Sequence, residues 1–131
     1  MTTTRIVGDI HGCFNDYKVM LEKSYDSIQI GDFGIGFAKD WWHERVNEFH
    51  KDSNHRFIRG NHDDPTKCRD MLGFINDGHV ENDIMFIGGA WSIDYQYRIE
   101  NETWWKDEQC SKEEFERISD IYNVVRPRIL F

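Results

Sequence analysis

The stretch RIVGDIHG, residues 5–12, runs from a short apolar segment into a loop that carries a carboxylate and an imidazole. Two later stretches repeat this arrangement: SIQIGD at 27–32 and HRFIRGNHD at 55–63. In each, an apolar or β-branched run of strand length ends at a glycine that is followed by polar side chains. The repetition predicts three strands, each with a polar loop at its carboxyl end.

Helical patterns follow the three loops. Residues 16–24 show apolar side chains at helical spacing, and a second helix is expected to be capped by Asp40, with Trp42 and Val46 on one face. Pro65 stands where the first turn of a third helix would begin. Three successive strand–loop–helix units favour an α/β fold with a parallel sheet, in which the polar loops meet at one edge.

The later part of the chain has a different pattern. Residues 78–87 form two short apolar runs around Asn82-Asp83, which predicts a hairpin. A capping box of Ser111 and Glu114 opens a predicted amphipathic helix that reaches Asn123, and residues 128–131 have the composition of a strand. Because no linker or low-complexity tract interrupts the sequence, residues 1–131 are expected to form a single domain.

Composition limits the classes of function. The 131 residues carry a formal net charge of −8 and include 19 aromatic side chains (five Trp, nine Phe and five Tyr), enough for a core rich in ring packing. The absence of a basic stripe argues against nonspecific binding of nucleic acid or of an anionic membrane surface. We find no signal peptide and no apolar run of the roughly 20 residues that a membrane span needs. The three cysteines include no Cys-x-x-Cys pair, which favours a reducing, cytoplasmic location.

The polar loops carry the side chains of a two-metal site. Asp9 and His11 are two residues apart on an extended loop, so both can reach one cation. Asp32 can bridge two cations through its two carboxylate oxygens, and Asn61 can add an amide oxygen to the second cation without adding charge. Two ions roughly 3.5–4 Å apart would hold a hydroxide between them and clamp a phosphoryl group. His62 would then orient the phosphate or protonate the leaving group.

Other polar residues have simpler interpretations. His43 and His50 lie seven residues apart in the predicted second helix, which is typical of a solvated or half-buried polar face. His55, at the start of a predicted strand, has the same interpretation. The acidic residues Asp107 and Glu108, like the acidic residues at 113–116, are expected to be solvated.

The ordered motifs Gly8–Gly12, Gly31-Asp32 and Arg59–Asp63 resemble those of the calcineurin-like metallophosphoesterase superfamily. The stretch Gly88–Asp94, with Arg98 and Trp104-Trp105 after it, is similar to a branch of small bacterial and phage phosphoesterases.

This resemblance implies a β-sandwich flanked by helices (αββα) and a binuclear centre of Mn, Fe, Zn or similar ions that hydrolyses phosphomonoesters or phosphodiesters. Asp9 and His11 would bind the first metal, Asp32 would bridge, Asn61 would bind the second metal, and His62 would be the catalytic histidine.

The sequence departs from the family pattern in two places. The positions where protein phosphatases of this family carry a further Asp and Arg are Ile35 and Gly36, which makes phosphoprotein substrates less expected. The family also places a histidine after a late strand, followed by Gly-His-x-His, and this chain ends at Phe131, before either.

Three interpretations of that ending are open. The favoured one is a C-terminally truncated hydrolase, in which an uncovered sheet edge could drive homo-oligomer formation. The second is half of a split enzyme that is completed by a C-terminal fragment. The third is a catalytically incomplete fold that acts as a binding module.

Overall fold

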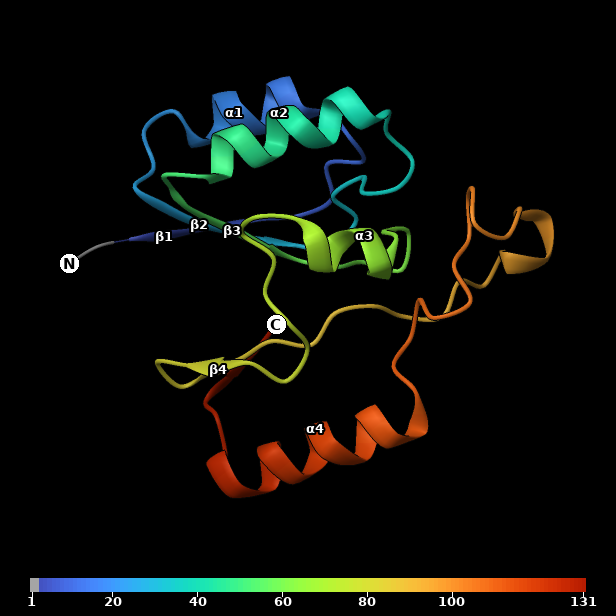
Figure 1. Cartoon of the computed structure of the whole chain (residues 1–131). Coiled ribbons are helices and arrows are strands. Elements are labelled where there is room, and N and C mark those ends of the chain that lie inside the picture. The colour runs from blue at the N-terminus through green and yellow to red at the C-terminus, as the bar shows by residue number, and fades with distance from the viewer. Residues whose placement is uncertain (1–2) are drawn as a thin grey trace.

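A parallel three-stranded sheet forms the centre of the computed structural model, which describes residues 3–131 (Figure 1). Its strands are β1 (Thr4–Val7), β2 (Asp26–Ile30) and β3 (Asn54–Ile58), in the order β1-β2-β3. All neighbours are parallel, so the loops that follow the three strands leave the sheet at the same edge. The three predicted strand–loop–helix units are therefore confirmed.

Helices follow each strand of this sheet. The helices α1 (Phe14–Leu21) and α2 (Asp40–His50) lie over one face of the sheet, and α3 (Pro65–Asp70) follows β3 (Figure 1). Apolar and aromatic side chains from α1, α2 and the sheet form the larger of two cores. Its members are Val7, Ile10, Phe14, Tyr17, Leu21, Phe33, Ile35, Trp42, Val46, Phe57, Cys68 and Met71.

A second, smaller sheet contains β4 (Val80–Glu81), β5 (Ile84–Met85) and β6 (Ile129–Leu130), in that order. The strands β4 and β5 form the predicted hairpin, and both residues of its turn, Asn82 and Asp83, have positive φ (49° and 67°). This conformation is the one that two-residue hairpin turns favour. The chain returns through α4 (Lys112–Val125), and β6 then pairs in parallel with β5.

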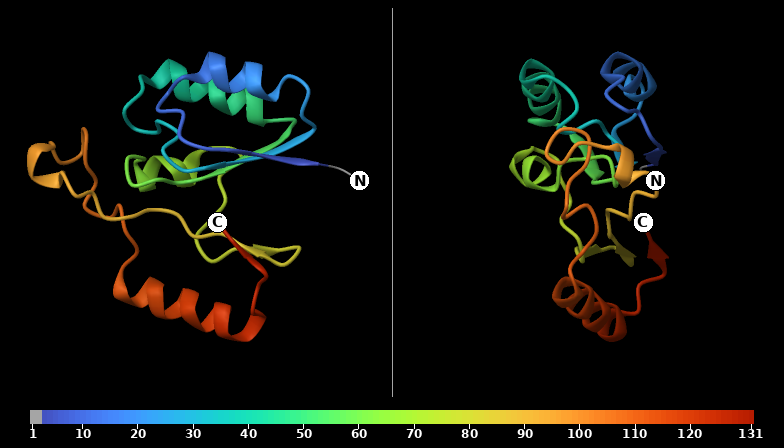
Figure 2. Two further views of the ribbon diagram at one scale, coloured as in Figure 1. Left: turned by 180° about the vertical axis from the view of Figure 1, so that it is seen from behind. Right: turned by 90° about the vertical axis from the view of Figure 1, so that its right-hand side faces the viewer.

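The elements stack in the order α1 and α2, first sheet, second sheet, α4 (Figure 2). Between the two sheets lies the second core, in which Ile28 and Ile58 of the first sheet meet Phe86 and Ile75, with Phe131 packed against them. The α/β class is thus established, with four α-helices and two small sheets among the described residues. None of the helices in residues 3–131 has the length and apolar content needed to cross a bilayer.

Helix boundaries agree with the sequence in part. Pro65 is the first residue of α3, and the capping box of Ser111 and Glu114 opens α4 as predicted. The cap expected from Asp40 is wrong: Asp40 is itself the first helical residue, Lys39 occupies the cap position, and no side chain caps this end. The first helix also begins at Phe14, two residues earlier than the apolar spacing indicated, and ends at Leu21.

The predicted polar faces of several histidines are also wrong. His43, His50 and His55 are buried. The ring of His50 stacks on Phe33 at 8°, and its Nδ1 lies 2.9 Å from the carbonyl oxygen of Leu72. Burial lowers the pKa of His50 to about 4 and also lowers the pKa values of His43 and His55. These neutral rings pack as aromatic core residues, a role that helical spacing does not reveal.

Candidate metal centre

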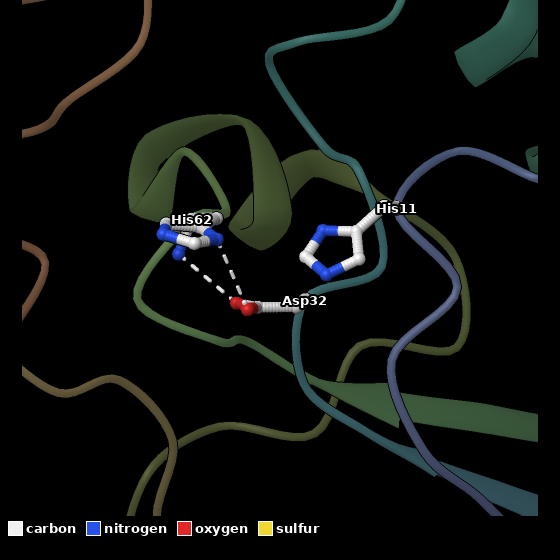
Figure 3. A group of neighbouring side chains, drawn as sticks. All are labelled: His11, Asp32 and His62. Carbon is white, nitrogen blue, oxygen red and sulfur yellow. Dashed lines mark hydrogen bonds and ion pairs between the residues drawn. The ribbon is translucent and has the colours of Figure 1, made fainter. Parts of the chain in front are cut away.

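Three of the predicted site residues converge at the carboxyl ends of β1, β2 and β3. His11, Asp32 and His62 each contribute one potential ligand atom, and these atoms lie within 4.8 Å of one another (Figure 3). In the part of the chain that the structure describes, this is the one group of three or more His, Cys, Asp or Glu residues arranged in this way. The parallel sheet brings together residues that are up to 51 positions apart in the sequence.

Asp32 is at the centre of the cluster. Its Oδ1 accepts a hydrogen bond from the backbone N–H of His62 at 3.0 Å, and its Oδ2 lies 3.1 Å from His62 Nδ1. The backbone of Asp32 has positive φ (52°), and its carbonyl oxygen accepts from the N–H groups of Ile10 and His11 at 3.2 and 3.0 Å. This conformation costs energy in a non-glycine residue, and the contacts on both sides hold it in place. Asp32 therefore ties the first and third motifs together.

Gly60 makes this position of Asp32 possible. A Cβ atom added to Gly60 would collide with the carboxylate and the backbone nitrogen of Asp32. Gly31 is similarly close: a Cβ there would lie 3.1 Å from Gly60 Cα, and the residue has a φ of 102°. The glycines before Asp32 and Asn61 are thus required for the close approach of two loops.

A buried carboxylate, Asp63, joins the loop after β2 to the loop after β3. Asp63 is fully buried and accepts four backbone hydrogen bonds, from Phe33, Gly34, Ile35 and Gly60, at 2.7–3.0 Å. Burial raises the pKa of Asp63, and the four N–H donors oppose that rise because they favour the charged form. The sequence does not indicate this role of Asp63, because all four partners are backbone N–H groups and three of them are 28–30 residues away.

A second buried carboxylate orients Asn61. Glu108, expected to be solvated, is instead fully buried and accepts hydrogen bonds from both the backbone N–H and the hydroxyl of Ser92. The Ser92 hydroxyl proton is therefore committed, so Ser92 Oγ accepts from Asn61 Nδ2 at 3.0 Å. This leaves the amide oxygen of Asn61 available to a cation, as its predicted role requires.

Asp9 and Asn61 lie outside the tight cluster, on a cavity beside it. Asp9 Oδ2 is 3.7 Å from His11 Nε2, and the Asp9 side chain is 62% exposed. Asp9, Asp32 and Asn61 line the same cavity of about 340 Å³, which extends between the two sheets. A larger cavity of about 530 Å³ is lined by α1, the residues after it, Phe49 and His55, and by none of the predicted site residues.

His62 makes a further contact that the sequence did not predict. Arg98 Nη2 lies 2.8 Å from His62 Nε2. A guanidinium group only donates hydrogen bonds, so Nε2 must accept and the proton of the neutral ring must be on Nδ1, where it points at Asp32 Oδ2. Arg98 is held in turn by both carboxylate oxygens of Asp94, at 2.7 and 2.8 Å, and by the carbonyl oxygen of Thr103. The Asp94 contact raises the pKa of Arg98, which stays charged.

The donor set fits a transition metal. Carboxylate oxygen, imidazole nitrogen and amide oxygen together suit Mn, Fe or Zn, and the net charge of −8 favours cation binding. The three potential ligand atoms of the cluster lie within 4.8 Å of one another, on loops that follow three neighbouring strands.

No family model, curated protein or solved structure matches this chain.

Proposed function

We propose that this chain is a metal-dependent phosphoester hydrolase of the calcineurin-like metallophosphoesterase type. The convergence of His11, Asp32 and His62 at the carboxyl ends of three parallel strands is the observation that carries the proposal. The order of layers, with two sheets between helices, is compatible with the αββα sandwich of that superfamily. Its substrate would be a phosphomonoester or phosphodiester.

The roles of the metal ligands follow from their positions. His11 and Asp32, with Asp9 at the rim, would hold a first ion, and Asp32 and Asn61 would hold a second. When bound, such ions neutralise charge on the phosphoryl group and provide an activated water as nucleophile. The proton that the leaving group needs would come from a side chain of this protein.

His62 is placed to donate a proton to the leaving group. Hydrolysis breaks the bond from phosphorus to the ester oxygen, joins the oxygen of water to phosphorus, and requires a proton on the departing oxygen. Asp32 Oδ2 holds the Nδ1–H of His62, which aims Nε2 away from the carboxylate and toward Arg98. A proton gained at Nε2 would be directed toward the leaving oxygen.

One observation favours a second candidate, a module that binds a single ion without turnover. Only three donors converge tightly among the described residues, and Asp9 is largely exposed. If these donors hold one ion, the remaining ligands for a second would have to come from a second copy of the chain or from a complementing fragment.

Metal content and hydrolysis, measured on one sample, test the proposal. The protein is loaded with manganese, desalted and analysed for metal, and is then assayed with an aryl phosphate monoester and a diester. We expect bound manganese and turnover, and at least a 100-fold loss of turnover in Asp32→Asn, because one oxygen of the bridging carboxylate is replaced by an amide nitrogen, which does not bind metal. Bound metal without turnover supports the binding module instead.

The variant His62→Ala separates two roles for this residue. As a proton donor, its loss should lower turnover by 10²–10⁴-fold, the usual scale for general acid catalysis, with the metal content nearly unchanged. Loss of manganese in His62→Ala would instead make His62 a ligand. His79→Ala, at an exposed histidine outside the cluster, is the matched control and should change neither quantity.

A further inference from the structure

A second cavity adjoins the cluster on the side of the His62 ring. It has a volume of about 270 Å³ and is lined by His11, Gly34, Phe37, His62 and Arg98. Two of its walls are thus the imidazoles of His11, a proposed metal ligand, and His62, the proposed proton donor. A substrate whose phosphoryl group sits at the cluster would extend its organic group into this space.

Phe37 provides an aromatic wall for the cavity. Its side chain is 45% exposed although it is a large apolar residue, and its ring packs edge-on against the buried Trp105 with centroids 5.1 Å apart. The Phe37 and His62 rings are 6.3 Å apart at 75°. Because Trp105 holds it from behind, Phe37 presents a fixed apolar surface beside the proposed proton donor.

Arg98 provides a cationic wall. Its guanidinium forms a bidentate ion pair with the Asp94 carboxylate. It also donates through Nη1 to the carbonyl oxygen of Thr103 and directs one Nη2–H at His62 Nε2. These contacts use four of the five N–H donors and leave one Nη1–H free. The Nη2–H that points at His62 and the remaining Nη1–H are the donors that Arg98 can offer to a phosphoryl oxygen placed beside the His62 ring.

Size and charge limit what the cavity can hold. Its volume lies just below the range of roughly 300–1,000 Å³ typical of pockets for small organic ligands, so it suits one ring rather than an extended chain. The net charge of −8 opposes a polyanionic substrate away from the cations. The Phe37 and His62 rings are edge-to-face neighbours, so an aromatic leaving group that contacts Phe37 would also lie next to His62.

We propose that this cavity is the leaving-group pocket for aryl phosphate esters, with Phe37 packing against the ring and Arg98 binding the phosphoryl group. The proposal rests on the phosphoester chemistry proposed above and assigns its substrate class. Phe37 would set the preference for a ring, whereas Arg98 would serve every phosphoester alike.

Two stable phosphonates test the pocket without any need for turnover. Phenylphosphonate and methylphosphonate carry the same charged group and differ by the ring. Titration calorimetry of the manganese-loaded chain should show phenylphosphonate binding at least tenfold more tightly. Equal affinities, or no binding of either compound, would overturn the proposal.

Variants of Phe37 and Arg98 test which residue contacts the ring and which binds the phosphoryl group. Phe37→Ala should reduce the ring preference to less than threefold, whereas Trp41→Ala, an exposed aromatic on α2 that does not line the cavity, should keep it. Arg98→Ala should weaken both phosphonates by tenfold or more, with partial recovery in Arg98→Lys. Arg69→Ala is the control for loss of a surface arginine. A ring preference that survives Phe37→Ala would place the ring elsewhere and overturn the assignment.

Two further comparisons separate this inference from its premise. The predicted binding pattern without hydrolysis of aryl phosphates would support the pocket and refute the proposed hydrolase. Hydrolysis with the same kcat/KM for aryl and alkyl phosphates would do the reverse. A preference for uridine 5′-monophosphate over ribose 5-phosphate, without one for phenylphosphonate, would identify a nucleotide site and refute the aryl pocket.

Discussion

At the scale of single residues, the position of the Asp32 carboxylate depends on the missing side chain of a neighbouring glycine as well as on its own hydrogen bonds. Gly60 gives Asp32 the space for its carboxylate, and a methyl group there would collide with that carboxylate. We expect Gly60→Ala to weaken manganese binding at least tenfold, because Asp32 must move away from the cluster. Overpacking of this kind should also lower the free energy of unfolding by roughly 1–3 kcal/mol.

A glycine of the first loop, after β1, is a matched control for this change. A Cβ added to Gly8, next to Asp9, would have no atom outside its immediate chain neighbours within 4 Å. Gly8→Ala should therefore leave manganese affinity and stability close to those of the natural chain. Isothermal titration with manganese and urea unfolding measure both quantities, and unchanged affinity in Gly60→Ala would contradict the requirement for glycine next to the Asp32 carboxylate.

The candidate site residues that the sequence predicts lie in short local motifs, whereas the residues that it does not predict contact partners far away in the sequence. Asp9, His11, Asp32, Asn61 and His62 stand in short motifs after apolar runs, so local pattern is enough to find them. The residues that hold them, such as Asp63, Ser92 and Glu108, act through partners distant in sequence. Glu108 was expected to be solvated because nothing near it in the sequence indicates that Ser92 will cover it.

At the scale of elements, local signals predicted what local contacts determine. The hairpin turn at Asn82-Asp83 and the capping box of α4 are both encoded within four residues, and both are present. The expected cap at Asp40 is wrong because the preceding residue, Lys39, already has the extended conformation of a cap, and the helix begins at Asp40, one position earlier than a cap at Asp40 would place it. A one-residue shift of this kind is below the resolution of hydrophobic periodicity.

The helix α4 has a capping box and few buried side chains. Within it, only Ile118 is buried, and Phe115 and Tyr122 are exposed, so tertiary packing holds little of its length. Ser111→Ala removes the side chain that accepts from the Glu114 N–H and should cost about 1 kcal/mol in local helix stability. Hydrogen exchange should show faster exchange of the α4 amides, with little change in the first sheet.

The conservative variant Ser111→Thr is the control for this loss. It keeps a hydroxyl acceptor at the cap position, so exchange in α4 should stay near that of the natural chain. Equal acceleration in both variants would mean that packing of the Ser111 side chain, rather than its hydrogen bond, stabilises the helix.

At the scale of the whole molecule, the two cores differ in composition. The core between the sheets is small and mostly aliphatic, whereas the core under α1 and α2 is lined by aromatic rings and abuts the buried histidines. His50 contacts Tyr17, Phe33 and Phe57 in ring pairs 5.7–6.1 Å apart. This larger core therefore requires His50 to be neutral, which couples folding to pH.

The direction of this coupling follows from the pKa of His50. Burial lowers that pKa to about 4 in the folded chain from 6.5, so between these values the unfolded chain binds more protons at this residue. His50 therefore contributes full stability above pH 6.5 and loses it as the pH falls toward 4. With about 1.4 kcal/mol for each pKa unit, the loss is on the order of 3 kcal/mol.

Urea unfolding between pH 7 and pH 4 tests this coupling through the difference between the natural chain and His50→Gln. The carboxylates titrate in both proteins, so their effect cancels in the difference, and His50→Gln should show a shallower fall in stability. A glutamine also remains neutral throughout, which removes the proton uptake without adding a charge to the core. Identical pH profiles would show that His50 takes up its proton without opening the core, and the stacked ring on Phe33 would then tolerate a charge.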